Sequence, residues 1–81
     1  MTTAPVTAAA EEFSTHITTE VVRLMERRGV SSRALAAAVD IPVTTLRRRL
    51  GGTTPFSVGE LACVAEALEV SAVDLMPKAG A

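Results

Sequence analysis

The stretch SSRALAAAVDIPVTTLRRRLGG, residues 31–52, predicts two short helices joined by a tight turn. Ser31 is a good N-cap for a helix over residues 32–39. Asp40 falls in the turn, where a left-handed backbone is often needed, and Asp tolerates that conformation better than most residues. Pro42 prevents the first helix from continuing and fits the start of a second helix, over residues 43–50. Gly51 and the glycine after it end this second helix.

The second helix has one apolar side and one polar side. At about 100° per residue, the side expected to face the core consists of Val43, Leu46 and Leu50. The outward side consists of Thr44, Thr45 and Arg48, and it is flanked by Arg47 and Arg49. Arg can bond a guanine edge with two hydrogen bonds, Thr can contact a base, and flanking Arg can reach phosphates, so this face suits the major groove of DNA. The plainer alternative is that the three arginines only keep a small helix in solution.

Positive charge is concentrated in the middle of the chain. The net charge is −1, but residues 23–49 hold seven Arg against two acids, whereas residues 1–22 hold three acids and no base. Such an asymmetry is typical of a nucleic-acid-binding surface even when the total charge is small. Ser32 and Arg33 lie in the first turn of the first helix, whose positive N-terminus could sit on a phosphate. An ordinary solvated face is the alternative.

Length and composition limit the other classes of protein. The 81 residues support one small domain, and 48% hydrophobic residues argue for a folded core. The single cysteine, Cys63, excludes an internal disulfide and a multi-cysteine metal site, and we expect it to fill space in the core or to be half-buried at its edge. No segment resembles a membrane span or a signal peptide, so we expect a cytoplasmic protein.

The flanking segments predict three further helices, and thus an all-α fold of five. A first helix should begin near residue 8 or 14 and end at residue 28, before Gly29. A fourth helix should begin at the capping box formed by Ser57 and Glu60 and end near residue 69. A short fifth helix should follow Ser71 and end at Pro77. We therefore divide the chain into an N-terminal arm or helix extension (1–13), a DNA-binding domain (14–76) and a tail (77–81).

Several positions together resemble the lambda repressor and Cro-like helix-turn-helix family. They are Leu35, Ala36, Ile41, Thr45, Leu46, Gly52, Pro55, Leu61, Ala65, Leu68 and Val70. Residues 41–52 are especially similar to small phage repressors of actinobacterial hosts. The resemblance implies a five-helix domain that binds operator DNA, commonly as a dimer, and controls transcription.

The resemblance also implies roles for individual residues. Val43, Thr44 and Arg48 would read bases with Arg47 beside them, Ser32 would help clamp the DNA backbone, and the loop with Gly52, Thr53 and Thr54 would meet phosphates. The chain departs from the family in the turn, where Asp40 replaces a frequent Gly. Leu50 and Met25 stand where relatives often place a Glu–Arg pair, and an apolar contact can replace such a pair without loss of stability. The N-terminal extension has no counterpart in the minimal family domain.

The sequence thus predicts a transcription regulator that binds specific sequences of double-stranded DNA. We expect a phage repressor or Cro-type protein that acts by operator occupancy, and possible formation of a homodimer. One alternative is a helical protein-interaction module, such as an antitoxin or adaptor, whose partner surface would include Val6, Phe13, Val73 and Met76. Another alternative is a recombination accessory factor that binds DNA. We expect no enzymatic activity, cofactor, metal, membrane contact or small-molecule ligand, because no acid pairs with a His or Cys at ligand spacing and no phosphate-binding glycine loop is present.

Overall fold

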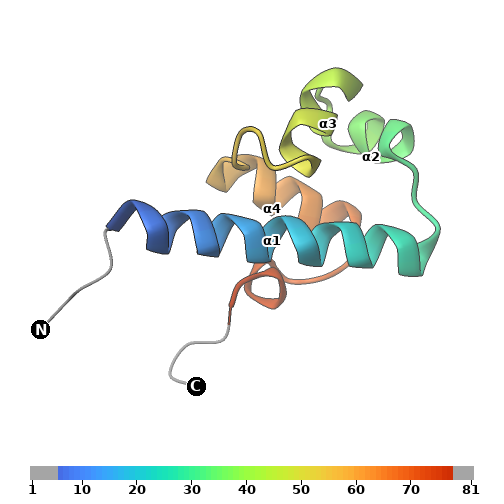
Figure 1. Ribbon diagram of the computed structural model, residues 1–81. Coiled ribbons are helices and arrows are strands. Elements are labelled where there is room, and N and C mark those ends of the chain that lie inside the picture. The colour runs from blue at the N-terminus through green and yellow to red at the C-terminus, as the bar shows by residue number, and fades with distance from the viewer. Residues whose placement is uncertain (1–5, 78–81) are drawn as a thin grey trace, which may run out of the picture.

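The computed structural model describes residues 6–77, which form four α-helices and one short 3₁₀ helix, without a strand in that range. The helices are α1 (Val6–Arg28), α2 (Ser32–Val39), α3 (Val43–Leu50) and α4 (Val58–Ala67), followed by the 3₁₀ helix η1 (Ala72–Leu75). α2 packs against α3 and α4, while α1 packs against α3 and η1. Figure 1 shows α2 and α3 together on one side of α1, with η1 on the other side.

The all-α class is confirmed, but the predicted count of five α-helices is wrong. The fifth element is a single 3₁₀ turn. Its start follows the prediction, because Ser71 and Asp74 form a reciprocal capping box. The element stops early because Met76, the residue before Pro77, is extended (φ −89°, ψ 152°), as a residue before proline usually is. Four residues between Ser71 and Met76 are too few for a longer helix.

α1 is longer than the shorter of the two predicted alternatives, since it begins at Val6 rather than at residue 14. Alanines and glutamates over residues 8–12 favour helix and carry it through the extension. Threonine is a weaker helix former, but Thr19 donates its hydroxyl hydrogen to the carbonyl of Thr15 (2.8 Å), so its polar group is satisfied inside the helix. Residues 1–5 and 78–81, part of the predicted arm and tail, lie outside the described range. The predicted domain boundaries themselves stay a prediction.

The four α-helices all end in the same way. A residue with a left-handed backbone follows each one, and the residues concerned are Gly29 (φ 66°), Asp40 (φ 57°), Gly52 (φ 81°) and Glu69 (φ 60°). In each case the next residue donates its N–H to the carbonyl five positions earlier, at distances of 2.9, 3.1, 3.1 and 2.9 Å in chain order. This pattern satisfies carbonyls that a helix end leaves without a partner. The stop signals predicted at Gly29 and Asp40 are confirmed.

The core is built from aliphatic side chains of every element. It contains Ile17, Val21, Met25, Leu35, Ala36, Leu46, Leu61, Val64, Ala65, Leu68 and Leu75. Leu46, on the inner side of α3, is fully buried, and Val43 and Leu50 pack against the same cluster. The predicted inward side of α3 is therefore confirmed. Met25 and Leu50 also pack on the core, as expected where relatives often place an ion pair.

Candidate nucleic-acid interface

The turn between α2 and α3 fixes how α3 is presented. The hydroxyl oxygen of Ser31 accepts the N–H of Ala34 (3.0 Å), which sets the start of α2. Asp40 (φ 57°, ψ 47°) then ends α2 in the left-handed conformation, and its own N–H bonds to the carbonyl of Ala36. Pro42 is the residue that precedes α3, with φ −59°. Local backbone bonds thus determine the reversal, and the buried Leu46 anchors α3 to the core.

The outer face of α3 is open to solvent. Thr44, Arg47 and Arg48 are exposed, while Thr45 is half-buried beside them. On α2, Arg33 is exposed and Ser32 is half-buried. The loop after α3 exposes Gly52, Thr53 and Thr54, and the N–H of Thr53 bonds to the carbonyl of Arg48 (3.1 Å), which ties this loop to α3. Each of these residues is therefore positioned on or beside the helix pair of α2 and α3.

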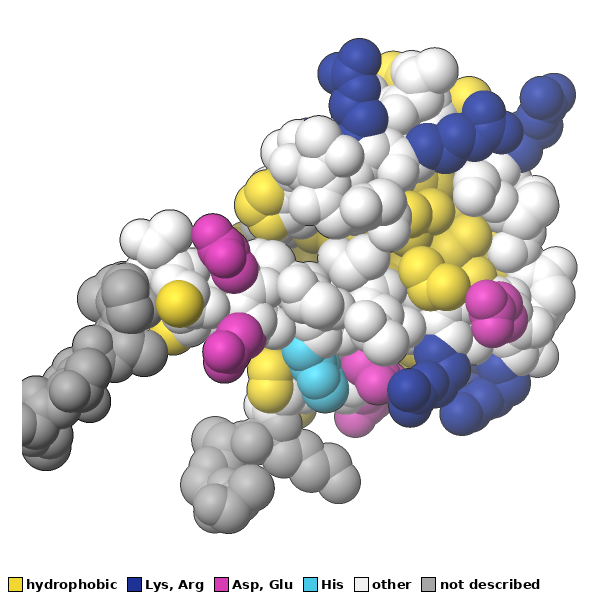
Figure 2. Space-filling model, viewed as in Figure 1, with side chains coloured by type: hydrophobic (Ala, Val, Ile, Leu, Met, Phe, Trp, Pro, Cys, Tyr) yellow, Lys and Arg dark blue, Asp and Glu magenta, His cyan; other side chains and the backbone are white. Residues whose placement is uncertain are grey.

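The interface carries three arginines that make no salt bridge within residues 6–77, namely Arg33, Arg47 and Arg48. Figure 2 shows Lys and Arg side chains gathered over α2 and α3, and a second group at the opposite edge, beside the C-terminal end of α1. The acidic side chains in this view lie mostly over α1. The positive charge seen in the middle of the sequence is thus divided between two surfaces, and only one of them includes α3.

Arg49 differs from the expectation that it faces phosphates. Its Nε donates to Oε1 of Glu60 (2.9 Å) and its Nη2 donates to Oε2 (3.2 Å), so α3 is joined to the first turn of α4 by a two-bond ion pair. Both side chains are only 20% exposed. The hydrogen bonds from Arg49 lower the pKa of Glu60, and the N–H of Ser57 (2.9 Å) lowers it further. The same pair raises the pKa of Arg49.

Glu60 was not predicted as a partner of Arg49, because its place in the capping box with Ser57 already accounted for an acid at this position. The capping box is present: the hydroxyl oxygen of Ser57 accepts the N–H of Glu60 (3.1 Å), and Glu60 accepts the N–H of Ser57. The available signal was a base in the last turn of one helix and an acid in the first turn of the next. A short loop that reverses the chain brings two such turns together.

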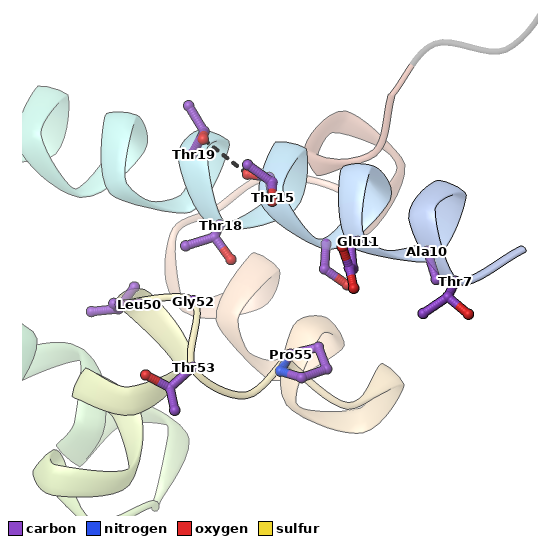
Figure 3. A pocket seen from close by; sticks show the side chains of 12 residues that line it. Thr7, Ala10, Glu11, Thr15, Thr18, Thr19, Leu50, Gly52, Thr53 and Pro55 are labelled. Carbon is purple, nitrogen blue, oxygen red and sulfur yellow. Dashed lines mark hydrogen bonds between the residues drawn. The ribbon is translucent and has the colours of Figure 1, made fainter. Parts of the chain in front are cut away.

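A groove borders the loop after α3. It has a volume of about 680 Å³ and lies between residues 7–19 of α1 and the segment that runs from Leu50 to Pro55. In Figure 3, Thr18 points across the groove toward the loop, and Glu11 lies on the α1 wall opposite Pro55. The walls are rich in hydroxyl groups, contributed by Thr7, Ser14, Thr15, Thr18, Thr19 and Thr53. A carboxylate here repels a phosphate, so Glu11 marks a boundary of the basic surface.

No group of three or more His, Cys, Asp or Glu side chains could hold a metal ion among residues 6–77. No helix there is long and apolar enough to cross a membrane. Cys63 is exposed on α4, which corrects the expectation that it fills the core. The core positions of this helical turn are taken by Val64 and Ala65 instead.

The exposed basic α3, held by α2 through a tight turn, defines a helix-turn-helix protein of the DNA-binding class. A family model for the Cro/C1-type helix-turn-helix DNA-binding domain matches residues 21–77. The chain belongs to this family, and the resemblance to lambda repressor and Cro-like proteins is confirmed. It is therefore a DNA-binding transcription regulator. Comparisons with curated proteins and with solved structures found no match.

Proposed function

We propose that this protein is a repressor or Cro-type regulator that recognises a specific operator in double-stranded DNA and acts by occupying it. The observation that carries the proposal is the outer face of α3, where Thr44, Arg47 and Arg48 are exposed and neither arginine makes an ion pair within residues 6–77. The buried Leu46 on the opposite side of the same helix holds this face outward. A rigid helix with free Arg and Thr side chains is suited to base edges in the major groove.

The residues divide into two kinds of contact. Thr44 and Arg48 supply base recognition, with Arg47 beside them. Val43 packs on the core with part of its side chain, and the part that stays exposed at the start of α3 contacts the same bases. Ser32, Arg33, Thr45, Thr53 and Thr54 contact the phosphate backbone. Base contacts carry sequence information, whereas phosphate contacts supply affinity that is independent of sequence and sensitive to salt.

The test starts by selecting bound sequences from a pool of random duplexes and then measures affinity for the selected and unselected DNA. Arg48→Ala is expected to reduce binding to the selected sequence by about 5–150-fold and unselected binding far less, because one bidentate base contact is worth about 1–3 kcal/mol. Arg33→Ala should weaken binding to both DNAs and flatten the salt dependence.

Arg27→Ala is the matched control. Arg27 is also an exposed arginine without a salt bridge in the described residues, but it lies in the last turn of α1. This variant removes one positive charge, as Arg48→Ala does, but from the basic side chains beside the C-terminal end of α1 rather than from α3. If Arg48→Ala kept the wild-type discrimination, or if Arg27→Ala lost as much of it, the assignment of α3 as the reading helix would be wrong.

We further propose that the protein binds as a homodimer, with exposed apolar side chains at its contact. Phe13 is 44% exposed on the extension of α1, and Val73 is 72% exposed on η1. A symmetric dimer would protect two half-sites about 34 Å apart, one turn of DNA, in a footprint. The same apolar residues favour the second candidate function, a protein-interaction module. A chain that remains folded, but from which no bound sequence can be selected at low salt, would support that alternative.

A further inference from the structure

The ion pair between Arg49 and Glu60 differs from the other two salt bridges in residues 6–77. Arg23 and Glu20 make a single contact of 3.4 Å, and Arg28 and Glu69 make one of 3.3 Å with the Glu side chain 81% exposed. Among these three pairs, Arg49 and Glu60 alone form two parallel hydrogen bonds with both side chains mostly shielded from water. A two-bond pair of this kind is geometrically specific and stronger than a loose surface contact.

The position of the pair gives it a consequence for DNA binding. Arg49 follows Arg48 directly in α3, and the loop that is bonded to the Arg48 carbonyl begins just after it. The guanidinium fork that now holds the Glu60 carboxylate is the same group that would hold a phosphate with two bonds. Glu60 is itself held in place by the Ser57 N–H at the start of α4. The carboxylate therefore competes with DNA phosphates for Arg49 from a fixed position.

We propose that Glu60 is a positioning residue that keeps Arg49 off the DNA backbone, and so limits the sequence-independent affinity of this interface. This inference rests on the proposed function. With Arg49 paired, the arginines of the helix pair that make no salt bridge within residues 6–77 are Arg33, Arg47 and Arg48. A fourth would add a phosphate contact, which strengthens binding to every sequence alike. Because Glu60 keeps Arg49 from making this phosphate contact, base recognition by α3 supplies a larger share of the binding free energy.

Glu60→Gln is the informative variant. Gln can occupy the third position of a capping box as Glu does, so the bond to Ser57 and the start of α4 can be retained while the charge is lost. Glu66→Gln is the matched control, because Glu66 is an exposed acid on the same helix, makes no salt bridge within residues 6–77, and its loss changes the net charge equally. Arg49→Gln and the double variant Arg49→Gln/Glu60→Gln complete the set.

The measurement is the affinity of each full-length variant for an unselected duplex of about 20 base pairs, enough for two half-sites. Salt is varied between about 50 and 200 mM, and folding is checked by circular dichroism. Releasing Arg49 should steepen the slope of log affinity against log salt by about 0.9, which adds about a 3-fold loss of affinity over this range. Glu60→Gln should show this steeper slope and tighter binding at low salt. Glu66→Gln, Arg49→Gln and the double variant should keep the wild-type slope.

Two results would overturn the inference. One is a Glu60→Gln slope no steeper than that of Glu66→Gln. The other is a flatter slope for Arg49→Gln, which would mean that Arg49 already contacts a phosphate in the wild-type complex. This second measurement tests the inference even if Glu60→Gln fails to fold. A wild-type protein that binds neither selected nor unselected DNA would instead refute the proposed function, and the inference with it.

Discussion

Replacement of Glu69 by glycine should stabilise the fold. Glu69 ends α4 with a left-handed backbone (φ 60°), and its neighbour Val70 donates its N–H to the carbonyl of Ala65 (2.9 Å). A residue with a Cβ atom pays about 1–2 kcal/mol for this conformation, whereas glycine does not. Glycine also gives the unfolded chain more freedom, which costs about 0.4–1 kcal/mol. The surface pair with Arg28 contributes little, because the Glu69 side chain is 81% exposed.

Subtracting the cost of the freer unfolded chain from the backbone energy that glycine relieves leaves a net stabilisation of about 0.5–1 kcal/mol. For a chain of this size, such a stabilisation raises the melting temperature by about 4 °C. Urea unfolding followed by circular dichroism measures it, since a small domain usually unfolds in one cooperative step. Glu69→Ala is the control: it removes the carboxylate and the Arg28 pair but keeps the Cβ atom. If the glycine variant were no more stable than the alanine variant, the reasoning from backbone conformation would fail. DNA affinity should be unchanged in both variants, because Glu69 lies outside the proposed interface.

Three further changes should have separate effects. Leu46→Ala should lower the free energy of unfolding by about 2–5 kcal/mol, because it leaves a cavity in place of a fully buried side chain of α3. Urea unfolding measures this loss, and a value under about 1 kcal/mol would contradict the packing described for Leu46. Asp40→Asn keeps a residue that tolerates the left-handed turn but removes a charge next to α3, so it should tighten DNA binding at low salt without changing the melting temperature. Because the pKa of Glu60 is lowered on folding, its stabilisation is present above the ordinary value of 4.5 and is lost as the pH falls through the lower folded value. Below pH 4.5, the melting temperature of Glu60→Gln should therefore fall less with decreasing pH than that of the wild type. If the plots of melting temperature against pH were parallel for the two proteins, this contribution would be excluded.

Local signals predicted much of the fold. Ser31, Asp40 and the capping box of Ser57 and Glu60 act through hydrogen bonds to backbone groups a few residues away, so the sequence pattern is enough to identify them. Gly29 was likewise predictable as the end of α1. The inward and outward sides of α3 followed from helical periodicity, because the helix is regular and packs on one side.

Contacts between elements were harder to predict. The pairing of Arg49 with Glu60 depends on how the loop between α3 and α4 reverses the chain, and a helical wheel for α3 alone cannot include α4. The exposure of Cys63, by contrast, could have been predicted, because Leu61, Val64, Ala65 and Leu68 form an apolar stripe at helical spacing and Cys63 lies outside it. Glu69 in a left-handed conformation could not be expected from its side chain, because glycine or asparagine is usual there.

The way in which the four α-helices end has a consequence for the speed of folding. Each of the four stops is fixed by a hydrogen bond between residues five positions apart, so no distant part of the chain has to arrive before a helix boundary forms. The chain can therefore define its helices early and then bring them together through short connections. Helical domains dominated by such local contacts typically fold in microseconds to milliseconds, and we expect this protein to fold within that range.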